Sequence, residues 1–130
     1  MEIKQQTADG IAASYTAAWN TGAPNAVASF YAENGDIIIN SGNPWTGRKG
    51  VAEMAAGFFA EVPDLKLVCD AVRCAGSHVV YLWTFTGTHA TSKKLLRVAG
   101  WEEWDLDKDR RIVASRGWYD AEDYARQAQS

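Results

Sequence analysis

The sequence predicts an α+β fold in which N-terminal helices cover one face of a strongly curved antiparallel sheet. In the first half of the chain, the apolar residues Ile11, Tyr15, Ala18 and Trp19 recur at steps of three and four, which is typical of a buried helix face. In the second half, segments rich in β-branched and aromatic residues alternate apolar with polar side chains. Helices that precede strands indicate separate layers, and 130 residues predict a single domain.

Three predicted helices come before the long strands. The first covers residues 3–20 and stops before Gly22, which can adopt the left-handed conformation of a helix cap. A short second helix covers residues 24–31 and begins with a proline, which suits the first helical turn. The third covers residues 48–61. A final polar helix is expected at residues 121–128.

One short strand and four long strands make up the predicted sheet. A turn at residues 33–35 leads into the short strand, residues 36–40, and a loop follows at residues 41–47. The long strands are expected at residues 65–74, 78–89, 95–106 and 111–120. A curved sheet of this kind, wrapped on three helices, forms a cone whose open end is a pocket.

Composition excludes several classes of function. A net charge of −3, with Lys and Arg scattered along the chain, does not suit nucleic-acid binding. The N-terminus has no apolar run, so neither a signal peptide nor a membrane span is expected, and the predicted location is cytoplasmic. Six Trp, five Tyr and four Phe serve either a core or a cavity lined for a flat apolar ligand.

The two cysteines, Cys69 and Cys74, are expected to be reduced. They lie five residues apart on one predicted strand, and this odd spacing directs them to opposite faces, where they neither pair nor share a metal. Neither a phosphate-binding glycine loop nor metal-ligand spacing is present in the sequence. We therefore expect no metal site and no cofactor.

Four short motifs carry a resemblance to a known family: residues 18–22 (AWNTG), 30–32 (FYA), 45–48 (WTGR) and 85–89 (FTGTH). Their order and spacing resemble the nuclear transport factor 2-like superfamily, and within it the SnoaL-like group of polyketide cyclases and ketosteroid-isomerase relatives. The resemblance implies the cone-shaped, cystatin-like fold. It does not imply one activity, because the superfamily holds isomerases, cyclases, dehydratases, epoxide hydrolases and proteins without catalysis.

The functional residues of the family match this sequence poorly. Ketosteroid-isomerase relatives carry an Asp base near the end of the first short strand, where Asn40 stands here. SnoaL-like cyclases use a His and an Asp on the last two strands. Counting back from residues 116–118 places Glu103 at the His position and Gly117 at the Asp position. No known activity is therefore implied unchanged.

Glu103 is the leading candidate for catalysis. With Trp101 and Asp105 it is expected on the pocket face, with Glu102 turned away. A carboxyl group enclosed by tryptophans loses hydration, which raises its pKa and suits it to act as general acid or base. The alternative is a surface carboxylate paired with arginines of neighbouring strands (Arg97, Arg111 or Arg116).

Asp36 and His89 are the other catalytic candidates. Asp36 could orient a water molecule or a substrate hydroxyl, although an Asp after Asn-Gly more often caps the turn. His89 lies at a strand end, where it could shuttle protons at the pocket mouth; the alternative is a surface histidine. Asn40 suits hydrogen bonding to a carbonyl group.

Aromatic residues are expected to bind the substrate. Tyr15 and Trp19 face the sheet one helical turn apart, and Trp45 lies on the loop before the third helix. The predicted lining is completed by Trp83, Trp101 and Trp118, although alternation does not decide which face Trp83 and Trp118 occupy. On the outer face, Trp104 and Leu106, joined by Trp83 if it occupies that face, would form an apolar patch, so a homodimer through the sheets is expected, as the resemblance also implies.

Two functions follow from these expectations. The first is a cofactor-free isomerase, cyclase or dehydratase that acts by general acid–base catalysis on a small hydrophobic cyclic molecule. The second is a non-catalytic ligand-binding or dimerisation module of the same fold. A cavity above ~300 Å³ that contains Glu103 or Asp36 would favour the first, and a cavity filled by tryptophans the second.

Overall fold

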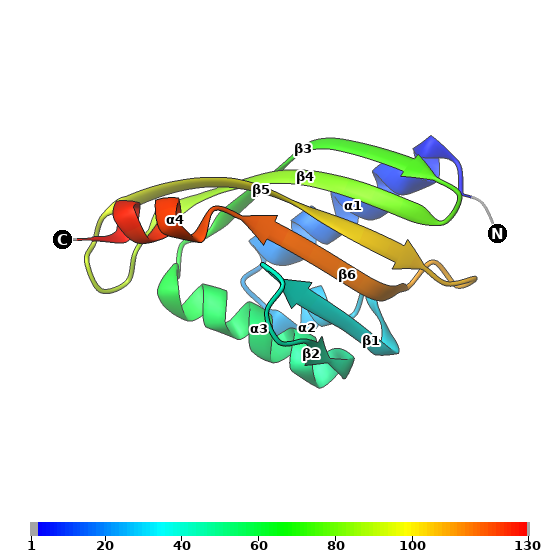
Figure 1. Cartoon of the computed structure of the whole chain (residues 1–130), viewed down its shortest axis with the longest axis horizontal. Helices are drawn as coiled ribbons and strands as arrows, with labels where there is room; N and C mark the ends of the chain where they lie inside the picture. Colours follow the sequence, from blue (N-terminus) through cyan, green and yellow to red (C-terminus); the bar gives the residue numbers. More distant parts are fainter. Residues whose placement is uncertain (1–2, 130) are drawn as a thin grey trace.

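The computed structural model describes residues 3–129. Figure 1 shows a long curved sheet with helices on its concave side and the two chain ends far apart. The elements are α1 (Gln5–Asn20), α2 (Pro24–Ala28), β1 (Tyr31–Ile39), β2 (Trp45–Thr46), α3 (Gly47–Glu61), β3 (Lys66–Ala75), β4 (His78–Thr88), β5 (Leu95–Leu106), β6 (Ile112–Tyr119) and α4 (Ala121–Ala128). Within residues 3–129, no helix is long and apolar enough to cross a membrane.

The six strands form one sheet in the order β2-β1-β6-β5-β4-β3. Neighbouring strands run antiparallel except β1 and β6, which pair in parallel. The layers are those that the sequence predicts, and the α+β fold class is confirmed. The parallel pair was not expected, because its partners lie at opposite ends of the chain.

The first strand begins five residues earlier than predicted. Tyr31, expected in the second helix, already pairs with Ile112 of β6. The pairing shifts register between Tyr31 and Asp36, and residues 33–35 lie in this irregular stretch. Gly35 allows the strands to approach here, since a Cβ atom at this position would lie 2.5 Å from the Ile112 carbonyl oxygen.

The expectation that the two cysteines face opposite sides of the sheet is wrong. Cys69 pairs with Trp83 and Cys74 with Val79, two buried residues of the same face of β4. The reason is a β-bulge between Cys69 and Ala71, which inserts one residue and reverses the alternation. Both cysteines pack against the core as free thiols.

Two helices supply most of the core beneath the sheet. From α1 come Ala8, Ala12, Tyr15, Ala18 and Trp19, and from α3 come Val51, Met54 and Ala55. The expected outer patch is wrong: Trp104, Leu106 and Trp83 are all buried on the inner face.

The C-terminal helix α4 spans the space between α3 and β5. The Tyr124 hydroxyl donates to the Glu61 carboxylate at the end of α3. The Gln127 side chain accepts from the backbone N–H of Arg97 at 2.7 Å and donates to its carbonyl oxygen at 2.9 Å. No residue of α4 is buried, so these hydrogen bonds and the contacts of the Tyr124 ring with Phe85 and Tyr119 hold it in place.

Candidate functional site

The inward side of β5 is formed by its even-numbered residues. Leu96, Val98, Trp104 and Leu106 are all buried, and Glu102 continues this series with 8% of its surface exposed. The prediction that Glu103 points into the pocket is therefore wrong by one residue. The sequence did contain the signal, since alternation traced from the aliphatic start of the strand reaches Glu102.

One oxygen of the Glu102 carboxyl group receives all its hydrogen bonds. Oε1 accepts from Trp104 Nε1 at 2.9 Å, from the Tyr15 hydroxyl at 3.0 Å and from the Ser115 hydroxyl at 3.5 Å. Among the described residues, none donates to Oε2. Burial raises the pKa of Glu102, and the three donors oppose this rise without cancelling it. When the group is protonated, the proton therefore belongs on Oε2.

Tyr15 joins this carboxyl group to a buried tyrosine pair. Its hydroxyl lies 3.2 Å from that of Tyr31, and because Tyr15 gives its only proton to Glu102, Tyr31 donates to Tyr15. Burial raises the pKa of Tyr15 well above its usual range, and the nearby Glu102 charge adds to the rise. The Tyr15 ring packs edge-on against Trp104 at 4.9 Å. Tyr15, one of the two aromatic residues predicted on α1, thus positions the Glu102 carboxyl group.

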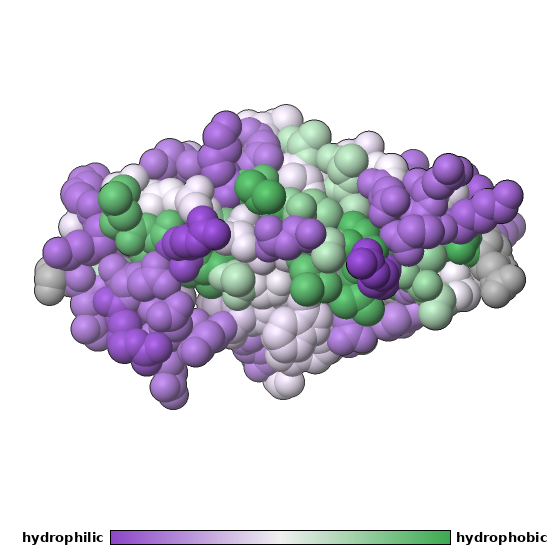
Figure 2. Space-filling view, turned by 90° about the horizontal axis from the view of Figure 1, so that it is seen from above, coloured by the Kyte–Doolittle hydropathy of each residue, from purple (hydrophilic) through white to green (hydrophobic). Residues whose placement is uncertain are grey.

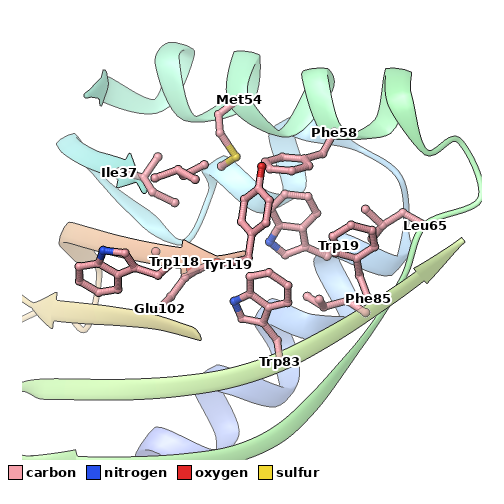
Figure 3. Close-up of a pocket in the computed structure, with 13 residues that line it drawn as sticks. Trp19, Ile37, Met54, Phe58, Leu65, Trp83, Phe85, Glu102, Trp118 and Tyr119 are labelled. Atoms are coloured by element: carbon pink, nitrogen blue, oxygen red, sulfur yellow. The ribbon is translucent and has the colours of Figure 1, made fainter. Parts of the chain in front are cut away.

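A cavity of about 50 Å³ lies between α3 and the inner face of the sheet. Glu102 is the one charged residue among the thirteen that line it, and most of the others are aromatic or aliphatic (Figure 3). Gly117 faces Glu102 across the β5–β6 pair, and a Cβ atom there would lie 3.3 Å from Glu102 Cγ. The missing side chain keeps this space open. The cavity is smaller than the ~300 Å³ of an ordinary small-molecule site.

Three predicted residues, Trp19, Trp83 and Trp118, are among those that line this cavity. Trp19 packs on Phe58 and Phe59, and Trp83 on Phe85 and Tyr119, with ring centroids 5.4–6.4 Å apart. In Figure 3 both indole nitrogens are turned toward the side on which Glu102 lies. The structure thus places Trp83 on the inner face, which alternation did not decide.

Glu103 lies on the outer face instead. Its carboxylate contacts His78 Nε2 at 3.0 Å and accepts from Trp101 Nε1 at 3.3 Å, while Asp105 contacts His78 Nδ1 at 2.8 Å. These two carboxylates raise the pKa of His78. The alternative partners considered for Glu103, the arginines of neighbouring strands, form no salt bridge with it in the described structure, although Arg116 stands opposite it in the β5–β6 pair.

Asp36 and Asn40 do not line the cavity. Asp36 forms a salt bridge of 3.0 Å with Arg116. Asn40 directly follows β1 in a left-handed conformation with φ of 53°, and its side-chain oxygen accepts from the backbone N–H of Tyr119 at 3.0 Å. Both side chains have structural partners, and a role in catalysis or binding stays a prediction.

The remaining predicted residues also lie outside the cavity or at its edge. His89 accepts from the backbone N–H of Ser92 at 3.2 Å, next to the ring of Tyr124. Trp45 is exposed on β2. Trp101 is 41% exposed on the outer face and stacks on Trp118, whose ring points away from the other lining side chains in Figure 3. Within residues 3–129, no cluster of His, Cys, Asp or Glu could hold a metal ion.

Comparison with known proteins gives a family and a fold. The model of the SnoaL-like domain family matches residues 11–115. A protein from Catenulispora acidiphila with a ketosteroid isomerase-like fold, solved with trimethylamine, has a TM-score of 0.84 at 20% identity over 91% of both chains. TsrD from Streptomyces laurentii has a TM-score of 0.84 at 18% identity over 98% of both chains.

A third structure is that of SalBIII, an epoxide hydrolase/cyclase-like enzyme of pyran ring formation in salinomycin. Its TM-score is 0.80 at 16% identity, over 92% of this chain and 95% of SalBIII. At these identities the structures are evidence for the fold alone. No functionally curated protein sequence matches this chain.

Proposed function

The chain belongs to the SnoaL-like domain family, and we propose that it binds a small hydrophobic molecule in the cavity and transfers a proton through Glu102. The observation that carries this proposal is that the two oxygens of the Glu102 carboxyl group have different surroundings. Oε1 accepts hydrogen bonds from Trp104, Tyr15 and Ser115, whereas Oε2 has no donor among residues 3–129. The Glu102 side chain lines the cavity. One oxygen fixes the position of the group and the other is free to react.

The chemistry proposed is a proton shift. Oε2 of the carboxylate takes a proton from a carbon next to a carbonyl group, and the protonated Oε2 returns it to another carbon of the same molecule, so that the protein ends unchanged. Burial raises the pKa of Glu102, which makes it a better base than an exposed carboxylate. Apolar walls keep water from competing for the proton. No cofactor is required for this step.

A non-catalytic ligand-binding module is the second candidate. It is favoured by the small volume of the cavity, about 50 Å³, which the rings of Trp19, Trp83 and Tyr119 largely fill. Gly117 and Asn40, which replace acidic residues of the family pattern, agree with this reading. Binding without turnover is its expected behaviour.

A two-step experiment separates these candidates. Thermal denaturation in the presence of cyclic ketones, lactones and steroids identifies ligands, because a molecule that binds only the folded state raises the melting temperature. Each ligand found is then incubated with the protein in D2O, and deuterium incorporation is measured by mass spectrometry. We expect incorporation with the natural protein and none above background with Glu102→Gln. Binding with no incorporation would contradict the catalytic proposal.

A homodimer through the outer face of the sheet is also proposed. Leu82 and Trp101 are each at least 40% exposed, and with Val80, Ala99 and Trp118 they line a shallow groove on this face. Seen from above, apolar residues form an interrupted band along the middle of the molecule, bordered by hydrophilic ones (Figure 2). Light scattering should give the mass of a dimer for the natural protein and of a monomer for Leu82→Glu. A monomeric natural protein would contradict this.

A further inference from the structure

One row of apolar side chains crosses the middle of the outer face of the sheet. Leu82 of β4 stands opposite Trp101 of β5, and Trp101 stands opposite Trp118 of β6. The two indole rings stack with centroids 5.4 Å apart, and Leu82 and Trp101 are each at least 40% exposed. Protein interfaces commonly have an apolar centre of this kind and a polar border. These three residues, the central row, are therefore the expected centre of the proposed homodimer contact.

On β5, two opposite charges lie at equal distances from the central row. Arg97 comes four residues before Trp101 and Asp105 four residues after it, so all three side chains point to the outer face. At about 3.3 Å of rise per residue, each charge is roughly 13 Å from Trp101 along the strand. Asp105 contacts His78, whereas Arg97 forms no salt bridge within residues 3–129. The charge of this arginine is therefore available to a partner.

On β6, the same arrangement recurs around Trp118. Arg116 comes two residues before Trp118 and Asp120 two residues after it, again on the outer face. Arg116 forms a salt bridge with Asp36, and Asp120 accepts from the backbone N–H of Asp123 through Oδ1. The second carboxylate oxygen of Asp120 has no donor among the described residues.

A third pair of opposite charges lies on β3. Arg73 stands opposite Val80, which is two residues from Leu82 along β4. On the other side of Leu82, the Asp70 carboxylate accepts from the Thr84 hydroxyl at 2.6 Å. Three strands of the sheet thus each carry one cation and one anion on opposite sides of the central row.

Two copies of the chain can bring their central rows together in two orientations. A two-fold axis parallel to the strands makes the strands of both sheets run in the same direction, so each level of one sheet faces the same level of the other. Lys66 and Arg97 lie on one level, since both align with Thr86, and neither forms a salt bridge in the described part of the chain. In this orientation cations would face cations.

A two-fold axis that crosses the strands gives the other orientation, in which each strand lies over its own copy and runs in the opposite direction. The two sides of the central row are then exchanged between the copies. We infer that the chain forms this antiparallel dimer, with Arg97 of each copy paired with Asp105 of the other. The other two pairs across the interface are Arg73 with Asp70 and Arg116 with Asp120. The inference rests on the proposed homodimer and specifies its orientation.

The curvature of the sheet decides what the charges contribute. The helices cover the concave side, so the outer face is convex (Figure 1). Two convex faces meet at their centres and diverge toward their edges, which leaves the central row packed and the charges near solvent. Stacked sheets lie about 10 Å apart, and the long side chain of Arg97 suits a contact across such a gap. Charge pairs of this kind determine orientation more than affinity.

Exchanging the charges of one pair tests the orientation. Arg97→Asp would bring two carboxylates together at both symmetric positions, and Asp105→Arg two cations, so each should raise the dissociation constant of the dimer by at least about tenfold. The double variant Arg97→Asp/Asp105→Arg should return this constant to within about threefold of the natural value. The two positions are roughly 26 Å apart along one strand, so only contacts between copies can produce the recovery. Sedimentation velocity at several protein concentrations measures each constant.

Lys49→Asp is the matched control. It makes the same change of net charge as Arg97→Asp, but it lies on α3 on the other side of the sheet, so the dissociation constant should stay within about twofold. Single variants that dimerise as tightly as the natural protein, or a double variant as weak as the single ones, would overturn the inference. A tighter dimer in Arg97→Asp would also overturn it, because that result indicates strands that run in the same direction.

The natural protein offers a test that does not depend on the folding of any variant. Salt screens attraction between opposite charges, so raising NaCl from about 0.05 M to about 0.5 M should raise the dissociation constant severalfold. A constant that stays the same or falls with salt would contradict pairs of opposite charge across the interface.

These measurements separate the orientation from the dimer itself. If the natural protein is monomeric, the proposed homodimer and this inference both fail. If Leu82→Glu dissociates the dimer while the charge variants leave it intact, the interface through the outer face stands and the antiparallel orientation fails.

Discussion

Glu102 and Glu103 are neighbours in β5, yet they lie on opposite faces of the sheet in opposite surroundings. Glu102 is buried and receives hydrogen bonds from neutral donors, two aromatic residues and a serine. Glu103 is partly exposed and contacts an imidazole that a second carboxylate also contacts. Neutral donors leave the cost of burying a charge partly uncompensated, whereas a protonated histidine offsets it. Burial thus raises the pKa of the inner carboxyl group, which the proposed proton transfer requires.

The largest difference should appear in stability when the neighbouring tryptophans are removed. Trp104 is 0% exposed and donates to Glu102, so Trp104→Ala should lower the free energy of unfolding by about 3–5 kcal/mol. Trp101→Ala removes a ring that is 41% exposed and should lower it by less than about 1 kcal/mol. Urea denaturation measures both. Equal losses would mean that the two faces are equally packed.

Shortening the side chain of Glu102 or of Glu103 by one methylene group should change the rate of deuterium exchange to very different extents. Glu102→Asp keeps the acid but withdraws it by one methylene group from the cavity and its three donors, so deuterium exchange of a bound ketone should fall by roughly a hundredfold. Glu103→Asp should leave the rate within about twofold, since its side chain faces outward. A comparable loss in both variants, measured by mass spectrometry, would remove Glu102 from its proposed role.

Filling the space opposite Glu102 should weaken ligand binding. The Cβ atom of Gly117→Ala would lie 3.3 Å from Glu102 Cγ and narrow the cavity, so affinity for a ligand identified by thermal denaturation should fall by about tenfold. Gly57→Ala is the matched control, because a Cβ atom in that part of α3 meets nothing within 4 Å. Calorimetric titration should show no change for the control. An unchanged affinity in Gly117→Ala would place the ligand elsewhere.

The smallest effects should be in the pH dependence of stability. The folded state raises the pKa of both Glu102 and His78 above their usual values of 4.5 and 6.5. A group with a raised pKa binds its proton more tightly when folded. Its contribution is therefore complete below the unfolded pKa and is lost as pH rises through the folded pKa.

The natural protein should lose free energy of unfolding as the pH rises above 4.5, because Glu102 gives up its proton, and Glu102→Gln should not show this loss. A second loss, above pH 6.5, should come from His78 and be absent in His78→Gln. The effect at His78 should be slight, because its side chain is 43% exposed and solvent screens its partners. Urea denaturation across this pH range tests both. If the natural protein instead gained stability relative to Glu102→Gln above pH 4.5, the pKa of Glu102 would be lowered by folding and the prediction would be wrong.

The sequence predicts the fold well because element order and alternation are local properties. It does not predict which glutamate points inward, because residues 101–104, Trp-Glu-Glu-Trp, have the same order of residues in both directions. Either alternation places one tryptophan and one glutamate inside, so the choice depends on residues at the strand ends, such as Leu96 and Leu106. The cysteine prediction failed for a related reason, since one bulge reverses the alternation beyond it.

The polar features of the site depend on contacts between distant segments. Tyr15 and Glu102 are 87 residues apart, and the sequence does not show that they meet. The indole N–H groups of Trp19 and Trp83, which have no hydrogen-bond partner in the described residues, are still harder to predict, because a missing partner is visible only when every neighbour is known. Tyr15, Trp19 and Trp83 were nevertheless among the predicted binding residues. Their aromatic character marks the inner face even where their hydrogen bonds cannot be foreseen.

Helix α4 connects α3 to the edge of β5 without burying a single residue of its own. Its anchors, Tyr124 and Gln127, contribute hydrogen bonds from side chains that can detach while every strand pairing stays intact. Local unfolding of so short a segment requires much less free energy than global unfolding. Fraying of α4 can therefore occur on its own, while the strands and the other helices keep their packing.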